Sequence, residues 1–503
     1  MINKKMPNKK MKVVIAGGGT AGWIAAAALA HQMGEILDIT LVESQEIGTI
    51  GVGEATIPPM RTFHRLLGIN EQEFMRATNA TFKLGIQFEN WEKIGGKYFH
   101  SFGITGKQTI VTDFIHFWLR GRELGIAQEF GDYCLEFKAA LKNRFSINEQ
   151  AKVNYAFHLD AGRYASFLRE RAEARGVKRV EGKIAQVKQN PESGFITSLK
   201  MESGQDIPGD LFLDCTGMRG ILIEQTLQTG FEEWGHWLPC DSAIAIQTES
   251  TGPAVPYTKS IAHHAGWRWQ IPLQHRVGNG IVFSSQYLSK DEALNMLLSS
   301  VDGKVLTEPN VIKFKTGRRK KSWNKNCIAM GLASGFLEPL ESTSIHMIMT
   351  AVTRLLLLFP HGEIKQSIVD EYNSQAESEF IRIRDFIILH YKATERDDSP
   401  FWRYCKDMEI PHDLMHRINL FKDFGRSNQV EGELFRLDSW TQVMLGQGII
   451  PASYHPIVDL MPERDLQLFL NSIATDVDKN IAMMSTHQDF LKKYCPSVVS
   501  NKK

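Results

Sequence analysis

Two short apolar runs near the start of the chain flank an alanine-rich stretch. Residues 12–16 and 38–42 are rich in Val, Ile and Leu, which is typical of buried strands. Residues 20–32 are mostly apolar and contain many alanines, so they predict a buried helix. A strand, a helix and a second strand in this order predict the first unit of an α/β fold with a parallel sheet.

Glycines with the spacing Gly-x-Gly-x-x-Gly join the first predicted strand to the helix. Missing Cβ atoms and the free N–H groups of a helix N-terminus let a pyrophosphate approach the backbone. The second strand ends at Glu43, about 20 residues beyond the last glycine, where a carboxylate can accept ribose hydroxyls. Together these features predict an adenine dinucleotide site. The predicted contacts are Gly17, Gly18, Gly19, Thr20, Ala21, Gly22, Glu43 and Ser44.

Residues 81–91 alternate between apolar and other side chains. The pattern predicts one half-buried strand, with Phe82, Leu84 and Ile86 on its inner face. Lys83 falls on the other face. The pattern alone therefore predicts that this lysine points into solvent.

Further elements are predicted between residues 165 and 217. Residues 165–176 have the pattern of a helix, and residues 177–188 and 195–201 have that of strands that return to the nucleotide-binding fold. Residues 210–217 predict a buried strand that ends in Thr-Gly near the cofactor.

Two tryptophans lie two residues apart in the middle of the chain. Trp267 and Trp269 belong to an extended segment that Pro272 ends, so both indoles are expected on one face. A core strand is the simplest interpretation of these residues alone.

A loop at residues 331–344 meets an apolar helical run that begins at Ile345. Ser342 or Thr343 is suited to cap this helix. The N–H groups of the first helical turn then form a candidate anion site.

The composition is that of a globular protein without a strongly charged surface. The chain has 503 residues, of which 43% are hydrophobic, and a formal charge of +1. Nothing in this balance indicates a nucleic acid or a membrane as partner. The six cysteines are widely scattered without metal-ligand spacing, so we expect no metal site and a reducing, cytoplasmic location.

Three motifs together resemble the flavin-dependent halogenases of the tryptophan halogenase family. They are Gly-Gly-Gly-Thr-Ala-Gly-Trp at residues 17–23, Gly-Val-Gly-Glu-Ala-Thr-Ile-Pro at residues 51–58, and Trp267-x-Trp269-x-Ile271-Pro272. The resemblance extends from about residue 11 to about residue 450. It implies an α/β fold, namely a flavin monooxygenase-like FAD-binding Rossmann-type fold with a mainly helical substrate-capping module. We expect the FAD-binding module at residues 10–362, with a covering insertion at 105–155, and the capping module at 363–503.

The resemblance also implies roles for individual residues. Lys83 and Glu341 correspond to the catalytic lysine and acid, and Lys83 lies in the family setting Phe-Lys-x-x-Ile-x-Phe. Thr343 and Ser344 correspond to the halide-binding pair, although Ser344 stands where the family has glycine. Candidate substrate contacts are His100, Phe102 and Phe435. Further candidate FAD contacts are Val52, Gly53, Glu54, Ile184, Leu332 and Ile345, with Ile184 packing on adenine.

Family enzymes use FADH2, O2 and a halide ion, chloride or bromide, to form hypohalous acid, which then halogenates an aromatic ring. Because no second glycine-rich fingerprint is present, we expect a separate flavin reductase to supply FADH2. The substrate is expected to be an electron-rich, indole-type aromatic. The segment between Phe421 and Ile450 lacks the Tyr-Tyr and Phe-Trp pairs that hold free tryptophan, which argues against that substrate. A homodimer is compatible with the sequence.

Two alternatives remain from the sequence. An aromatic hydroxylase has the same fold and would add one oxygen without needing halide. A flavin-binding protein without catalysis, such as a sensor or carrier, would not depend on Lys83.

Overall fold

A mostly parallel sheet of six strands forms the nucleotide-binding part of the computed structural model, which describes residues 10–47, 53–147 and 153–496. Its neighbours pair in parallel except at one edge, where β21 and β22 are antiparallel. In spatial order the strands are β21 (Trp323–Asn324), β22 (Cys327–Ala329), β13 (Leu211–Asp214), β1 (Met11–Ala16), β2 (Leu37–Glu43) and β9 (Lys178–Glu181). The predicted strand, helix and strand at the start of the chain are confirmed.

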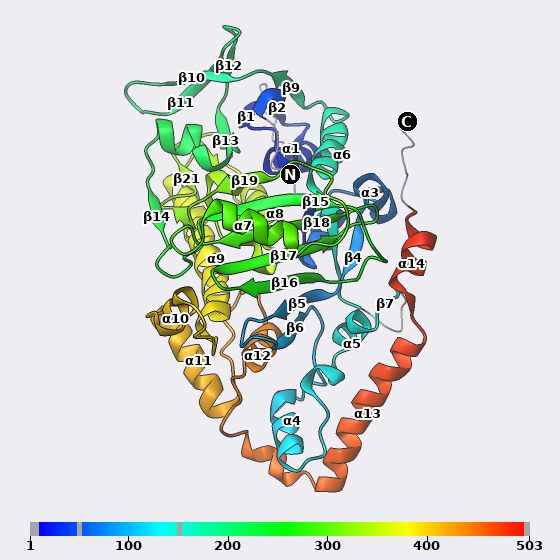
Figure 1. Ribbon diagram of the computed structural model, residues 1–503. Helices are drawn as coiled ribbons and strands as arrows, with labels where there is room; N and C mark the ends of the chain where they lie inside the picture. The colour runs from blue at the N-terminus through cyan, green and yellow to red at the C-terminus, as the bar shows by residue number, and fades with distance from the viewer. Residues whose placement is uncertain (1–9, 48–52, 148–152, 497–503) are drawn as a thin grey trace, which may run out of the picture.

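A second sheet of seven strands crosses the middle of the molecule (Figure 1). Its strands are β19 (Asn310–Lys313), β15 (Ser242–Thr248), β18 (Val277–Phe283), β17 (Gly266–Pro272), β16 (Thr258–His263), β5 (Gly85–Glu89) and β6 (Lys97–Ser101). A small sheet lies against β17 and β18 and consists of β3 (Gly53–Ala55), β8 (Ala156–Asp160) and β4 (Thr81–Lys83). The remaining strands are β10 (Ile184–Gln189), β11 (Ile196–Met201), β12 (Asp206–Pro208), β14 (Phe231–Glu233), β20 (Gly317–Arg319), β23 (Gly335–Phe336), β7 (Arg144–Phe145) and β24 (Ser485–Thr486).

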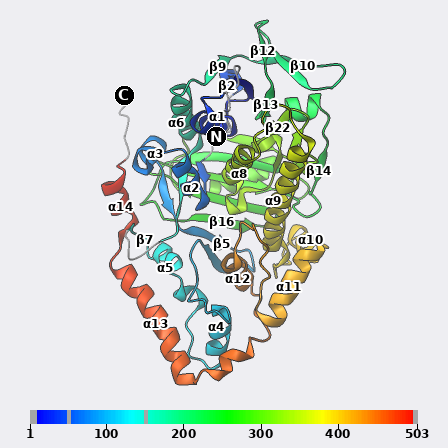
Figure 2. The same cartoon turned by 180° about the vertical axis from the view of Figure 1, so that it is seen from behind.

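Helices cover both sheets and fill the lower half of the molecule (Figure 1). Those of the N-terminal part are α1 (Thr20–Met33), α2 (Pro59–Leu66), α3 (Glu71–Thr78), α4 (Phe114–Glu123), α5 (Leu135–Leu141), α6 (Ala161–Glu173), α7 (Lys290–Ser299) and α8 (Ser344–Leu357). The C-terminal helices are α9 (Gln366–Lys392), α10 (Pro400–Asp407), α11 (His412–Phe424), α12 (Leu437–Gly446), α13 (Glu463–Ala482) and α14 (His487–Tyr494). The view from behind shows α8 and α9 on the opposite side of the molecule from α7 (Figure 2). Among the described residues, no helix is both long and apolar enough to cross a bilayer.

The segment at residues 81–91 is extended as predicted, but it forms two strands instead of one half-buried strand, because the chain changes sheet at Leu84. The N–H of Leu84 donates to the carbonyl of Pro256 instead of continuing one ladder. Consequently β4 pairs with β8 in the small sheet, while β5 pairs with β6 and β16 in the large one. Other parts of the protein cover both faces of this segment. The alternation of apolar and other side chains therefore did not show which of them are exposed to solvent. The Lys83 side chain is 0% exposed.

Only part of the region from residue 177 to residue 201 returns to the nucleotide-binding sheet. Strand β9 pairs with β2 as expected. Strands β10 and β11 instead form a separate antiparallel sheet with β12. The short turn between β9 and β10 allows this change of sheet, and apolar patterning alone does not distinguish the two pairings.

The glycine loop requires its glycines because the backbone is closely packed there. Gly17 has φ = +110°, and a Cβ on it would lie 2.3 Å from the carbonyl oxygen of Cys215. A Cβ on Gly22 would lie 1.9 Å from the carbonyl oxygen of Gly17. A Cβ on Gly19, by contrast, would have no atom of the described residues within 4 Å. The loop is therefore packed on its inner side and open above Gly19.

We expect Gly22→Ala to destabilise the protein and Gly19→Ala to leave its stability nearly unchanged. The first substitution forces two backbone segments apart, and overpacking of this kind costs about 1–3 kcal/mol. Thermal unfolding of the cofactor-free variants measures the difference as a midpoint several degrees lower for Gly22→Ala. Equal midpoints would show that the loop does not depend on this close approach.

Candidate active site

A buried lysine lies at the centre of the candidate site. The Nζ atom of Lys83 donates to Oγ of Ser342 at 2.7 Å and to the carbonyl of Thr56 at 3.1 Å. It also lies 5.2 Å from the centre of the Phe102 ring. Burial lowers the pKa of Lys83 to about 7, although the nearby charge of Glu341 acts in the opposite direction. Both protonation states of this amine are therefore accessible near neutral pH.

Glu341 is held between two histidines and is itself 0% exposed. Its Oε2 atom accepts from Nδ1 of His100 at 2.8 Å, and its Oε1 atom lies 2.9 Å from Nε2 of His390. Tyr98 Oη and His390 Nδ1 are 2.7 Å apart, so the tyrosine can donate and leave the His390 proton on the nitrogen that faces Glu341. Burial raises the pKa of Glu341, but the two histidines outweigh it and the resulting pKa is about 2. The carboxyl group is therefore ionised at neutral pH.

The turn after Glu341 leads directly into helix α8 and leaves polar groups without partners. Thr343 is the N-cap residue, yet its side chain makes no capping hydrogen bond. Its Oγ1 atom is buried and has no hydrogen-bond partner in the described part of the chain. An anion at this helix N-terminus would satisfy such donors. Ser342 has the left-handed conformation (φ = 60°), whereas Ser344 is the first residue of the helix, so the backbone does not require a glycine at position 344.

Aromatic rings form one wall beside His100. The Phe386 ring lies 5.6 Å from the His100 ring, and the Phe435 ring lies 6.2 Å from it. Phe386 and Phe435 stack on each other at 3.8 Å. Phe435 and Trp440 also line a cavity of about 510 Å³ between α8, α9 and the loop before α12. Phe435 therefore borders both this cavity and the His100 ring.

The candidate FAD residues surround the open side of the glycine loop. Gly331 approaches α1 closely, since a Cβ on it would lie 2.9 Å from Cβ of Ala21. Leu332 follows it in a 3-10 turn, and Ile345 is buried in the first turn of α8. The N-cap of α1, Gly19, has no side-chain cap, so the first N–H groups of α1 remain free for an anion. These features fit a bound dinucleotide.

The other predicted FAD contacts have varied surroundings. The carboxylate of Glu43 accepts from the indole N–H of Trp23 at 3.2 Å and pairs with Arg179. Ser44 and Ile184 are half-buried. Gly53 and Glu54 lie in β3, and burial raises the pKa of Glu54 to about 7. Val52 lies outside the described residues.

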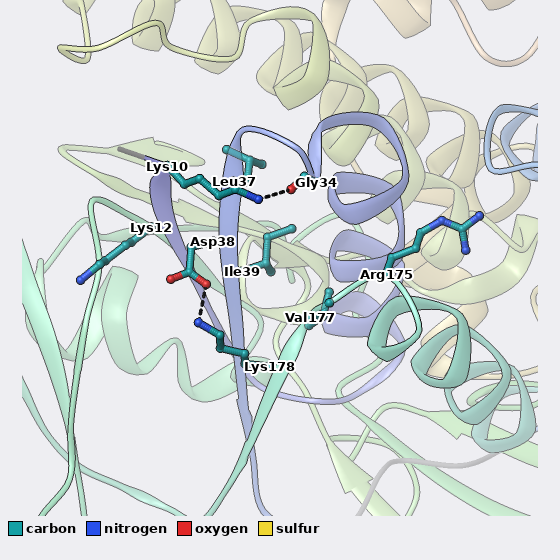
Figure 3. Close-up of a pocket in the computed structure, with 10 residues that line it drawn as sticks. Lys10, Lys12, Gly34, Leu37, Asp38, Ile39, Arg175, Val177 and Lys178 are labelled. Carbon is teal, nitrogen blue, oxygen red and sulfur yellow. Dashed lines mark hydrogen bonds and ion pairs between the residues drawn. The ribbon is translucent and has the colours of Figure 1, made fainter. Parts of the chain in front are cut away.

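A basic cavity of about 540 Å³ lies at the other end of the parallel sheet (Figure 3). Lys10, Lys12, Arg175 and Lys178 line it, and Lys178 pairs with Asp38 at 2.9 Å. It is next to the first residues of β1, β2 and β9, whereas the glycine loop follows the last residue of β1. It is therefore separate from the candidate dinucleotide site. No cluster of His, Cys, Asp and Glu in the described ranges could hold a metal ion.

The structure brings together several predicted site residues that lie far apart in the sequence. It also places further residues beside them that were not predicted. Lys83, His100, Phe102, Glu341 and Thr343 meet at one place, and Phe435 joins their aromatic wall. Sequence patterns did not select His390, Tyr98 or Thr56, and they selected Ser342 only as a candidate helix cap. Contacts with distant segments place these residues beside Lys83 and Glu341.

Comparisons with known proteins agree with this geometry. A family model described as tryptophan halogenase matches residues 12–463. Tryptophan 6-halogenase SttH from Streptomyces toxytricini is 36% identical over 457 residues, which cover 84% of this chain and 85% of SttH. The structure of Xcc4156, a flavin-dependent halogenase from Xanthomonas campestris, is 53% identical with a TM-score of 0.96, covering 97% of this chain and 99% of that one. BrvH, a flavin-dependent halogenase from Brevundimonas sp. BAL3, is 43% identical with a TM-score of 0.93, covering 97% and 100%.

The family model and the similar structures extend over most of the chain. They confirm the resemblance based on the three motifs, and the FAD-binding Rossmann-like fold with it. Enzymes of this kind use FADH2, O2 and halide, with a separate flavin reductase and a small aromatic substrate. The chain belongs to the tryptophan halogenase family and is a flavin-dependent halogenase, an oxidoreductase that halogenates aromatic substrates.

Proposed function

We propose that the protein halogenates an electron-rich, indole-type aromatic through Lys83 and Glu341. The observation that carries this proposal is the fully buried amine of Lys83, which donates to Ser342, the residue next to the ionised Glu341. Burying an amine and a carboxylate in one place costs free energy of folding. A site that keeps both groups is therefore a candidate for a functional role. We also propose residues 10–362 as the FAD-binding module, with a covering insertion at 105–155, and residues 363–503 as the capping module.

FAD supplies the oxidising chemistry when it is bound in reduced form and meets O2 and halide. The open backbone above Gly19 and the uncapped first turn of α1 would hold its pyrophosphate. The proposed contacts are Gly17, Gly18, Gly19, Thr20, Ala21, Gly22, Glu43, Ser44, Val52, Gly53, Glu54, Ile184, Leu332 and Ile345. The close packing of Gly331 on Ala21 supports the idea that the loop before α8 faces the same cofactor.

Lys83 would deliver the halogen to the substrate. Its ammonium can hydrogen-bond to hypohalous acid and polarise it, and its neutral amine can form a haloamine. A pKa of about 7 makes both forms available, so the two routes remain alternatives. In either case the amine is fixed by Ser342 and Thr56, which restricts where the halogen is released.

Glu341 would stabilise the cationic ring that forms on halogen attack and accept its proton. An acid with a pKa of about 2 is ionised at neutral pH and is suited to stabilise positive charge in a buried site. The contacts with His100 and His390 hold the carboxylate in place. Thr343 and Ser344, at the N-terminus of α8, would bind the halide ion.

The substrate ring would lie against His100, Phe102 and Phe435. Phe102 lies beside the lysine, and the other two rings lie 6.2 Å apart. Tryptophan halogenases among the relatives support an indole-type ring. All six cysteines are free thiols, which supports a reducing, cytoplasmic location.

The main test is the effect of Lys83→Ala on halogenation. The protein would be incubated with FAD, NADH, a flavin reductase, O2 and either bromide or chloride over a panel of indoles. We expect halogen isotope patterns by mass spectrometry for the wild type and their loss in Lys83→Ala, because the buried amine is removed. FAD binding and peroxide formation should stay nearly unchanged.

The matched control is Lys97→Ala, since Lys97 is an exposed lysine on the neighbouring strand β6. This variant should halogenate like the wild type. Oxygenated products that form without halide would favour the hydroxylase alternative. Loss of FAD binding in Lys83→Ala would assign Lys83 a structural role instead.

A second prediction concerns the cost of burying the lysine. Below about pH 7 the folded and unfolded states both carry the proton, and the full burial cost is present. Between this pH and 10.5 the unfolded state binds the proton that the folded state has lost, so the wild type gains stability relative to Lys83→Met. Denaturant unfolding at a series of pH values should show this gain, with a slope of at most about 1.4 kcal/mol per pH unit. Parallel curves for the two proteins would contradict the lowered pKa.

A further inference from the structure

A second acid, Glu338, is buried in the same turn and has no role in the chemistry described above. It is 0% exposed and directly precedes the 3-10 turn η6 (Pro339–Glu341). Its Oε2 atom accepts from Nε1 of Trp267 at 2.9 Å and from Oη of Tyr391 at 2.6 Å. Its Oε1 atom has no hydrogen-bond partner among the described residues. Burial raises the pKa of Glu338 to about 7, in contrast to the lowered pKa of Glu341.

Helix α9 contacts both ends of this turn through two consecutive residues. Tyr391 donates to Glu338 at the start of the turn, and His390 lies 2.9 Å from Glu341 at its end. Strand β17 adds a third attachment through Trp267. The turn is therefore held between the large sheet and the longest helix.

The turn has little internal support of its own. The N–H of Ser342 donates to the carbonyl of Pro339, and Ser342 adopts a left-handed conformation. The side chain of Thr343 does not cap α8. The geometry of the turn is therefore fixed mainly by side-chain contacts with neighbouring elements.

We propose that Glu338 is a positioning residue that fixes the turn carrying Glu341 and the halide-binding backbone through its hydrogen bonds to Trp267 and Tyr391. The inference rests on the proposed halide site at Thr343 and Ser344. It gives Trp267 a specific role as a hydrogen-bond donor, in addition to filling space. The acceptor atom is what matters, so glutamine, which keeps a carbonyl oxygen and nearly the same volume, should substitute for Glu338.

The test compares Glu338→Leu with Glu338→Gln. Leucine has a similar size but removes both acceptor interactions. The indole N–H of Trp267 then loses its partner, and the hydroxyl of Tyr391 keeps only the weak contact with Sγ of Cys240 at 3.6 Å. An unpaired buried donor changes the equilibrium between the ordered and displaced turn by about tenfold or more. We expect Glu338→Leu to raise KM for bromide at least tenfold and to lower kcat, while KM for indole and the affinity for FAD stay within about twofold. Glu338→Gln should restore both constants to within about threefold of wild type.

Removing single donors provides the matched comparison. Trp267→Phe and Tyr391→Phe should each raise KM for bromide by less than Glu338→Leu. The control is Trp323→Phe, which also removes a buried indole N–H bond, that to the carbonyl of Lys325 at 2.9 Å, but at a site remote from the turn. It should leave KM for bromide unchanged, even if it lowers the thermal midpoint.

A direct readout separates this inference from the proposed function. Crystals soaked in bromide should show an anomalous peak beside the amides of Thr343 and Ser344 in the wild type, and a much weaker one in Glu338→Leu. Equal bromide peaks would overturn the positioning role, as would increases in KM for bromide and KM for indole that match the loss of FAD affinity. Absence of aryl bromide from the wild type would contradict the proposed function, and the bromide peaks would still decide the role of Glu338.

Discussion

The buried pair of an amine and a carboxylate is the constraint on which the site depends. Lys83 and Glu341 interact electrostatically, but the contacts of the described residues place Ser342 and two histidines around them without a direct salt bridge. Each charge therefore keeps its own hydrogen-bond partners. Burial lowers the pKa of Lys83 to about 7 despite the nearby carboxylate, whereas a direct ion pair would favour the protonated amine more strongly.

This arrangement explains why the fold brings several sheets together at one point. Lys83 comes from the small sheet and His100 from the large one, because the chain changes sheet at Leu84. Glu341 comes from the turn before α8, and His390 comes from α9. No single element could hold these groups, so the site requires the junction between the sheets and the helices behind them.

Local patterns were sufficient to predict the first part of the fold but not the surroundings of the lysine. The glycine loop, β1, α1 and β2 follow from short-range spacing and apolar runs, which determine local structure directly. The strand pattern around Lys83 predicted exposure, because alternation reveals a solvent face only when one face of a strand is uncovered. Lys83 became a site candidate through the family motif rather than the pattern, and the burial of its side chain supports that proposal.

His390 and Glu338 show the limit of such reasoning. Their importance depends on contacts with segments about 50 to 70 residues away in the sequence, and neither belongs to a spacing motif with its partners. Both residues have apolar neighbours in the sequence, so the local pattern predicted only an ordinary helix position for His390 and an ordinary loop position for Glu338. Only the packed structure shows that consecutive residues of α9 contact both acids of one turn.

Ser344 stands where the family has glycine. This difference changes the side chains that line the proposed halide site more than it changes the backbone there. A glycine would be needed if position 344 were left-handed, but that conformation belongs to Ser342. The helix therefore begins at Ser344 without strain and keeps its N–H groups directed out of the first turn. The hydroxyl of Thr343 lies beside them and has no partner among the residues that the structure describes, so these groups provide several donors to one anion. The site thus retains the electrostatics of a helix N-terminus while replacing a bare backbone with hydroxyl groups.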